Sequence, residues 1–270
     1  MIKNLLKQKL NQNTLNRLRR MRRRAAFHSE GLLGGGPRRE EFLLRLLGRH
    51  YEAQFRRDWQ LSEEEPHFFS HRIGLFKLAF GDETIGPYAY SRAFYSAEVV
   101  REGDRLLDIG CGDGFFTKRF LSARCSKVDA LDVEPSAIQA AQKDNSAPNI
   151  TYYLLDAVNE PFPSDEYDVI VWDGALGHFS PETTHLMLQK IVKHLAPEGI
   201  FVGSESLGHE GTDHLQFFES LEVLREIFRG HFRHVELRST DYRIGDFVRS
   251  EAYWRCAQTR DRLESNHWQT

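Results

Sequence analysis

From Asp104 onward, short apolar runs alternate with stretches whose apolar residues recur at helical spacing. The apolar runs, which we predict to be strands, are Arg105–Ile109, Lys127–Val133, Ile150–Leu155, Asp168–Trp172, Gly199–Ser204, Val235–Arg238 and Ala252–Cys256. The predicted helices are Phe115–Ala123, Pro135–Asn145, Pro181–Leu195 and Phe218–Phe228. Strands that alternate with helices favour a doubly wound sheet, because neighbouring parallel strands need a crossover connection. We therefore expect an α/β fold built on a mostly parallel, seven-stranded sheet.

The first predicted strand continues into a glycine-spaced turn, Asp108-Ile109-Gly110-Cys111-Gly112-Asp113-Gly114. Glycines let a ligand approach the backbone closely, and open α/β sheets bind ligands at the carboxyl ends of their strands. The spacing is G-x-G-x-G, whereas a dinucleotide fingerprint requires G-x-G-x-x-G. Asp108 and Asp113 would repel a pyrophosphate, but they suit a cationic ligand with an amino group. No Gly-Lys-Ser/Thr sequence follows, which excludes a phosphate-binding P-loop.

Residues 106–115 resemble motif I of the class I S-adenosylmethionine-dependent methyltransferases, and the resemblance extends from about 104 to 257. It implies a Rossmann-like methyltransferase fold with S-adenosyl-L-methionine as the cofactor. The motif I residues that it assigns to the cofactor are Asp108, Gly110, Cys111, Gly112 and Gly114. After the second strand, it assigns Asp132 to the ribose hydroxyls, with Val133 beside it and Glu134 as the less favoured substitute. After the third strand, it assigns Asp156 to the adenine amino group and the amide of Ala157 to the ring.

Each of these acids has a plainer interpretation as a helix cap or a surface turn residue. Their recurrence at successive strand ends argues against that interpretation for Asp108 and Asp132. It leaves the plainer interpretation open for Asp113 and Asp156.

A segment before motif I, residues 86–95, is rich in tyrosine and contains Arg92. Related enzymes often lay such a segment over the cofactor. The resemblance therefore suggests that Arg92 pairs with the methionine carboxylate and that Tyr88 shields the sulfonium. The alternative is that the tyrosines of this segment are ordinary core residues.

Two residues after the fourth predicted strand are candidates for a general base, Asp173 and His178. Methyl transfer to a hydroxyl requires removal of its proton, and histidine titrates in the useful range. A histidine here can also shape the cofactor pocket without catalysing, and Asp173 is also a predicted cofactor contact. The loop at residues 204–214 favours a substrate lid over a metal site, because its histidine spacing does not match a zincin motif.

The acceptor is inferred by elimination. The Asp-Pro-Pro-Tyr type motif of many amino methylases is absent, since the corresponding residues are Trp172-Asp173-Gly174-Ala175, and no cysteine pair suits pyrimidine C5 chemistry. We therefore expect a small-molecule or glycan acceptor that is methylated at oxygen. Two alternatives remain: a protein or RNA methyltransferase whose basic arm binds the substrate, and a non-catalytic adapter that keeps the fold.

The charge of the chain is unevenly distributed. The formal net charge is −3 at pH 7, yet residues 1–27 contain lysine and arginine but no acidic residue. The basic segment suits an anionic membrane surface or an acidic partner, and a solvated tail is an equally good interpretation. The acidic remainder disfavours nucleic-acid binding.

The expected organisation has four parts: a basic segment at 1–30, a helical extension over the cofactor and substrate at 31–101, an S-adenosylmethionine-binding domain at 102–258, and a polar tail at 259–270. The extension begins with the breaker Gly34-Gly35-Gly36-Pro37. Three cysteines are scattered singly, so we expect neither a disulfide framework nor a zinc site. No apolar run spans a bilayer and no secretory signal is evident, so the expected location is cytoplasmic, with peripheral membrane attachment through residues 1–27 left open. The oligomeric state is also left open.

Overall fold

The computed structural model describes residues 42–43, 46, 88–209, 214–244 and 247–263. The chain forms two compact units, Met1–Ala53 and Gln54–Thr270. Apart from Phe42, Leu43 and Leu46, which are helical and exposed, the predictions made for the basic segment and for the extension up to residue 87 lie outside the described residues. None of the described helices is long and apolar enough to cross a membrane.

The described part of the second unit is built on a seven-stranded sheet. Its strands are β1 (Arg105–Ile109), β2 (Lys127–Asp132), β3 (Ile150–Leu154), β4 (Tyr167–Asp173), β5 (Leu195–Leu207), β6 (His234–Ile244) and β7 (Phe247–Ala257). The longer helices are α5 (Tyr88–Ala97), α6 (Pro135–Asp144), α7 (Pro181–His194) and α8 (Leu221–Arg229). Three short helical turns are η2 (Thr117–Leu121), η3 (Ser122–Arg124) and η4 (Leu176–His178).

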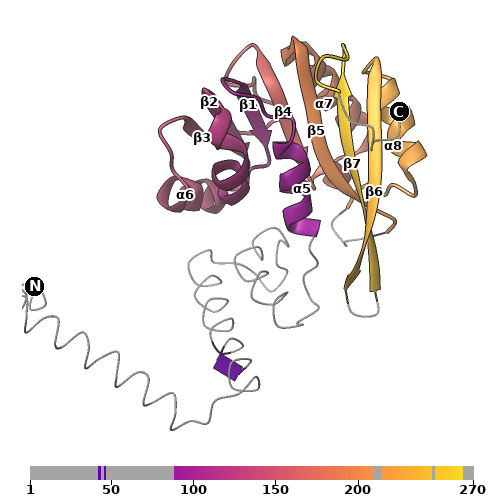
Figure 1. Cartoon of the computed structure of the whole chain (residues 1–270), viewed down its shortest axis with the longest axis horizontal. Coiled ribbons are helices and arrows are strands. Elements are labelled where there is room, and N and C mark those ends of the chain that lie inside the picture. Colours follow the sequence, from indigo (N-terminus) through magenta and orange to yellow (C-terminus); the bar gives the residue numbers. More distant parts are fainter. Residues whose placement is uncertain (1–41, 44–45, 47–87, 210–213, 245–246, 264–270) are drawn as a thin grey trace, which may run out of the picture. The chain divides into compact units, whose positions relative to one another are not determined.

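The strand order is β3-β2-β1-β4-β5-β7-β6 (Figure 1). The first five strands of the chain pair in parallel, whereas β7 is antiparallel to both β5 and β6. The expectation of a doubly wound, mostly parallel sheet is therefore confirmed. Because β1 and β4 are neighbours although β2 and β3 intervene in the chain, the strand order reverses at β1. Ligands of open α/β sheets bind at the carboxyl ends of the strands beside such a reversal.

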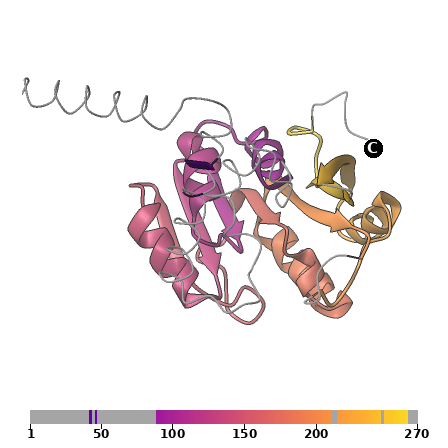
Figure 2. The same ribbon diagram turned by 90° about the horizontal axis from the view of Figure 1, so that it is seen from below.

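Two apolar layers hold the sheet, one on each face. Successive side chains of a strand point to opposite faces, so neighbouring residues of β1 and β4 enter different layers. One layer includes Leu107, Ile170, Leu188 and Phe228, and the other includes Leu106, Val169, Ile138 and Ala141. Figure 2 shows helices on both sides of the sheet. Burial on both faces explains why the parallel strands appear in the sequence as continuous apolar runs.

The element after the glycine turn differs from the predicted helix at Phe115–Ala123. Residues Thr117–Leu121 form a π-helical turn, in which the amide of Ser122 donates to the carbonyl of Thr117, and a 3₁₀ turn follows. Apolar periodicity indicates a helix without distinguishing these hydrogen-bond patterns. Single π-helical turns occur frequently at functional sites.

The last three strands are longer than predicted, at 13, 11 and 11 residues for β5, β6 and β7. The predicted segments stopped where polar residues begin, because only apolar runs were taken as strands. Polar residues nevertheless continue these strands, and Glu205 of β5 and Glu251 of β7 are both buried. The polar extensions lie beyond the carboxyl end of β4, and therefore next to the site.

Candidate active site

The glycine turn connects β1 to η2. Gly110, Gly112 and Gly114 have φ values of 72°, 55° and 70°, a region that residues with a Cβ rarely adopt. Space is also absent at Gly114, since a Cβ there would lie 2.4 Å from the hydroxyl of Tyr152 on β3. Tyr152 is itself held in place, because its hydroxyl donates to the carbonyl of Asn145 at 2.8 Å. The turn therefore requires glycine for backbone conformation and, at Gly114, for packing.

The end of β2 fixes the turn from one side. The amide of Gly110 donates to the carbonyl of Leu131 at 2.8 Å. The carboxylate of Asp132 accepts from the amide of Gly112 at 2.8 Å and from the amide of Glu134 at 2.9 Å. Burial raises the pKa of Asp132, and these amide donors partly offset the rise. A carboxylate has about four acceptor positions, so Asp132 keeps capacity for ligand hydroxyls.

Asp108 lies beneath the turn, near the carboxyl end of β1. It is 6% exposed, and its carboxylate accepts a hydrogen bond from the hydroxyl of Thr117 at 2.6 Å. Burial raises the pKa of Asp108 to about 7, although the Thr117 hydrogen bond lowers it in part. A cation close to Asp108 would stabilise the carboxylate form. Asp113, by contrast, accepts from the amide of Phe115 at 3.1 Å, as a turn residue does.

The loop after β3 is organised by Asp156. Its carboxylate accepts from the amide of Val158 at 2.9 Å and from the side-chain amide of Asn159 at 2.7 Å. The hydrogen bond from Asn159 is the main reason that the pKa of Asp156 is lowered. Asp156 is thus a turn residue, in agreement with the plainer interpretation, and it also lines the cavity together with Ala157.

The end of β4 carries Asp173, which faces α5. The hydroxyl of Ser96 donates to the Asp173 carboxylate at 3.1 Å. Burial raises the pKa of Asp173 to about 6, and the positive charge of Arg92 opposes that rise. A Cβ at Gly174, where φ is 64°, would lie 2.7 Å from Nη1 of Arg92. Arg92 and Ser96 are one helical turn apart, so both lie on the same face of α5, which packs against the end of β4.

The guanidinium of Arg92 also packs against an aromatic ring. Its guanidinium carbon lies 5.0 Å from the ring centroid of Phe116, in cation–π geometry. The described contacts include no hydrogen bond from the Arg92 guanidinium, so its donors are available to a ligand that enters the cavity.

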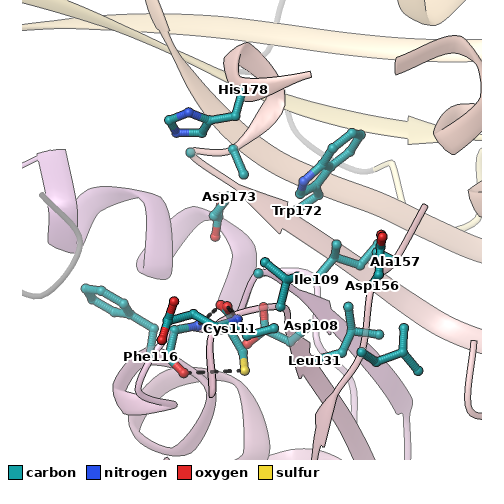
Figure 3. Close-up of a pocket in the computed structure, with 18 of the residues that line it drawn as sticks. Asp108, Ile109, Cys111, Phe116, Leu131, Asp156, Ala157, Trp172, Asp173 and His178 are labelled. Carbon is teal, nitrogen blue, oxygen red and sulfur yellow. Dashed lines mark hydrogen bonds between the residues drawn. The ribbon is translucent and has the colours of Figure 1, made fainter. Parts of the chain in front are cut away.

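His178 lies at the rim of the same cavity, in η4. Its side chain is exposed, and its ring meets that of His214 edge-to-face with 4.6 Å between centroids. In Figure 3, His178 lies on the far side of Asp173 from the glycine turn. The loop that carries His214 is docked through Gly177, whose carbonyl accepts from the amide of Leu215 at 2.8 Å. The amide of Gly177 in turn donates to the buried carboxylate of Glu205 at 2.9 Å.

These residues surround a cavity of about 570 Å³ at the carboxyl ends of the parallel strands (Figure 3). The predicted site residues that line it are Arg92, Asp108, Gly110, Cys111, Gly112, Asp132, Val133, Asp156, Ala157, Asp173 and His178. Gly114 is absent from the lining and supports the turn from behind. The side chain of Tyr88, the first residue of α5, lies outside what the structure describes. Among the described residues, no cluster suits a metal ion.

Sequence reasoning missed several residues that shape this site. Ser96 donates a hydrogen bond to Asp173, and the ring of Phe116 packs against Arg92. Glu205 accepts from the amide of Gly177 in the loop after β4. The spacing of four between Arg92 and Ser96 was the available signal for Ser96, because such residues share a helix face. No sequence pattern pointed to Glu205, since its partner lies 28 residues away along the chain.

Residues 106–199 match the family model described as a methyltransferase domain. The 27-O-demethylrifamycin SV methyltransferase of Amycolatopsis mediterranei is 31% identical over 94 residues, covering 33% of this chain and 34% of the relative. The EEF1A lysine methyltransferase 4 of Mus musculus is 26% identical over 140 residues, covering 47% of this chain and 54% of the relative. The matched segment contains the glycine turn and β1–β4, and these relatives are methyltransferases, in agreement with the resemblance to the class I S-adenosylmethionine-dependent methyltransferases.

A solved structure has the same fold as the domain that contains this segment. The N-methyltransferase NodS from Bradyrhizobium japonicum WM9, in complex with S-adenosylhomocysteine, has a TM-score of 0.50 and 21% identity, and the match covers 65% of this chain and 90% of NodS. The chain spans about a third to a half of the length of the first curated relatives that it matches. Those relatives act on different acceptors by name, so an acceptor for this chain does not follow from theirs.

The cavity fits S-adenosylmethionine in size and in chemistry. Its volume lies in the range of small-molecule sites. Carboxylates from β1 and β2 suit an ammonium group and ribose hydroxyls, and the glycine turn lets a ligand reach the backbone. The guanidinium of Arg92, which lines the same cavity, suits a carboxylate.

Proposed function

We propose that this chain transfers a methyl group from S-adenosyl-L-methionine to the hydroxyl of a small molecule or glycan. The observation that carries the proposal is Asp173, a carboxylate that shares one cavity with the glycine turn. Its pKa of about 6 makes it ionised at neutral pH, yet more basic than an ordinary aspartate. A group of that kind can accept the proton of an acceptor hydroxyl.

The cofactor contacts are proposed along the strand ends. Asp156 and the amide of Ala157 take the adenine, and Asp132, with Val133 beside it, takes the ribose hydroxyls. The turn from Gly110 to Gly112, including Cys111, lies against the chain of the methionine part, and Asp108 faces its ammonium group. Arg92 pairs with its carboxylate, and Tyr88 covers the sulfonium.

The cofactor supplies a methyl group on a positively charged sulfur, which becomes a neutral thioether as the methyl–sulfur bond breaks. The acceptor hydroxyl forms the new carbon–oxygen bond, and its proton passes to the Asp173 carboxylate. Ser96 orients Asp173 through their hydrogen bond, and the charge of Arg92 keeps it ionised. His178, at the rim, shapes the entrance for the acceptor and is the second candidate for the base.

An exchange at position 173 tests this function. Screening hydroxylated small molecules and sugars with labelled cofactor first identifies an acceptor. We expect Asp173→Asn to lower kcat about 100-fold, since general-base catalysis contributes at least that factor. In the wild type kcat should rise with pH through about 6, because only ionised Asp173 accepts the proton, and this limb should be absent in the variant.

His178→Gln is the matched control. If His178 only shapes the entrance, its kcat stays within about tenfold of the wild type and the pH limb near 6 persists. A normal rate for Asp173→Asn together with a large loss for His178→Gln would move the base to His178. Failure of every hydroxyl acceptor would overturn methylation at oxygen.

A protein acceptor is the second candidate function, because one relative is by name a lysine methyltransferase. The basic segment at residues 1–27 decides between the two, since under the leading proposal it attaches a cytoplasmic enzyme peripherally to anionic membranes. Deleting residues 1–27 should then abolish binding to phosphatidylserine vesicles and leave turnover of a soluble acceptor unchanged. Loss of turnover on a protein or RNA acceptor would instead make the segment a substrate-binding arm.

A further inference from the structure

Lys190 of α7 lies behind the loop that follows β3. Its ammonium nitrogen donates to the carbonyl of Ala157 at 2.6 Å and also to the carbonyl of Glu160. The same nitrogen lies 4.3 Å from the ring centroid of the buried Phe162. An ammonium group has three donors and no acceptor, so two carbonyls and a ring face nearly satisfy it. Lys190 itself does not line the cavity.

Two hydrogen bonds between Asp156 and Glu160 close the loop that follows β3. The amide of Asp156 donates to the side chain of Glu160 at 3.0 Å, and the amide of Glu160 donates to the carbonyl of Asp156 at 2.9 Å. This ring of bonds sets the shape of the loop but does not anchor it to the domain. Lys190 supplies an anchor from α7, because Ala157 and Glu160 both accept from its one nitrogen.

We propose that Lys190 is a positioning residue for adenine recognition, which it controls by holding the loop of Asp156 and Ala157 against α7. This inference rests on the proposed function, which places the adenine at that loop. The carbonyl of Ala157 accepts a hydrogen bond from Lys190, and the amide of Ala157 is proposed to contact the adenine ring. The ammonium group therefore holds the same residue that contacts the ligand. A shift of the loop would move the Asp156 carboxylate away from the adenine amino group.

The charge of Lys190 acts in the same direction as its hydrogen bonds. Asn159 is the main cause of the lowered pKa of Asp156, and the positive charge of Lys190 adds to the effect. Burial lowers the pKa of Lys190, while the nearby acids Asp156 and Glu160 oppose that change. Lysine therefore helps to keep Asp156 as an acceptor, which is the form that an adenine amino group requires.

Binding of two ligands by the full chain tests the inference. S-adenosylhomocysteine carries the adenine amino group, whereas S-inosylhomocysteine carries a carbonyl oxygen in its place. In Lys190→Met we expect the affinity for S-adenosylhomocysteine to fall about tenfold, as for loss of one well-placed hydrogen bond. The affinity for S-inosylhomocysteine should change by less than about twofold, so the preference for adenine should fall by about fivefold or more.

Lys193→Met is the matched control, since Lys193 is exposed in the last turn of the same helix. It should leave both affinities unchanged. Lys190→Arg should restore most of the preference, because a guanidinium can donate to two carbonyls. If Lys190→Met does not fold, Lys190→Gln replaces it, because its shorter amide cannot reach both carbonyls and should show the same loss of preference.

Two results would overturn the inference. The first is that the Lys190 variant that folds binds both ligands with unchanged affinity. The second is that its affinity for both ligands falls equally, which would show that Lys190 only supports the fold. Either result leaves the proposed function standing. Failure of the wild-type chain to bind S-adenosylhomocysteine at all would instead contradict the proposed function.

Discussion

The two halves of the strand-end edge differ in the donors to most of their acids. In the cofactor half, at the ends of β1–β3, main-chain amides donate to Asp132 and Asp156. In the acceptor half, at the ends of β4 and β5 and on the adjoining β7, side chains do so: Ser96 donates to Asp173, and Arg249 donates to Glu251. The exceptions are Asp108 in the cofactor half, which accepts from the hydroxyl of Thr117, and Glu205 in the acceptor half, which accepts from the amide of Gly177.

The amides of Glu134 and Val158 and the side chain of Arg249 donate to an acid two residues away, whereas the amide of Gly112 and the hydroxyl of Ser96 reach theirs across 20 and 77 residues of chain. A main-chain donor does not depend on the side chain of its residue, so substitution can change the donors to Asp173 and Glu251 more readily than the amide donors to Asp132 and Asp156.

The largest effect is expected from adding a methyl group to the turn of the cofactor half. Gly114→Ala places a Cβ 2.4 Å from the Tyr152 hydroxyl at a φ of 70°. Backbone strain and overpacking each cost about 1–3 kcal/mol, so we expect the free energy of unfolding to fall by about 3 kcal/mol in denaturant titrations. Gly103→Ala is the control, since its φ is 87° but no atom lies within 4 Å. Equal losses would show that packing on Tyr152 is unimportant.

A comparably large effect on binding is expected at the end of β2. Asp132→Ala removes the acceptor proposed for two ribose hydroxyls, so calorimetry should show S-adenosylhomocysteine binding weakened about 100-fold while the protein stays folded. Glu134→Ala tests the neighbouring acid, which also lines the cavity but whose side chain caps α6 by accepting from the amide of Ser136 at 3.1 Å, so it should weaken binding far less. Unchanged affinity in Asp132→Ala would remove the ribose assignment.

The smallest effect is expected in the acceptor half and depends on pH. Burial raises the pKa of Glu251 from 4.5 to about 7, and the charge of Arg249 only partly offsets it. The folded state therefore holds a proton that the unfolded state has lost, so stability decreases as pH rises from about 4.5 to 7. Glu251→Gln should remove this decrease.

Chemical denaturation at a series of pH values measures that difference. The unfolding free energy of the variant relative to the wild type should increase by about 1–2 kcal/mol between pH 4.5 and 7, and stay level below pH 4.5. A difference that does not depend on pH would show that Glu251 titrates normally, and the contrast between the two halves would weaken.

The sequence predicted most of the cofactor half and less of the acceptor half. The glycine turn, Asp108 and Asp132 were predicted as site residues because they lie at or beside strand ends, and they line one cavity because strand ends converge in a parallel sheet. Asp173 and His178 were predicted because they come at and after the end of β4, and they line the same cavity. The π-helical turn was missed because apolar periodicity does not distinguish it from an α-helix. The polar parts of β5 and β7 were missed because their buried acids interrupt the apolar pattern.

By itself, the sequence determined the order of strands and helices, the positions that require glycine, and the acids at the strand ends, because these depend on local backbone geometry and apolar periodicity. Only the tertiary structure decided which side chains serve those acids. Ser96 reaches Asp173 across 77 residues of chain, and Lys190 reaches Ala157 across 33. Such contacts arise from the packing of α5 and α7, and so do the raised pKa values of the buried carboxyls, since burial is a property of the whole fold.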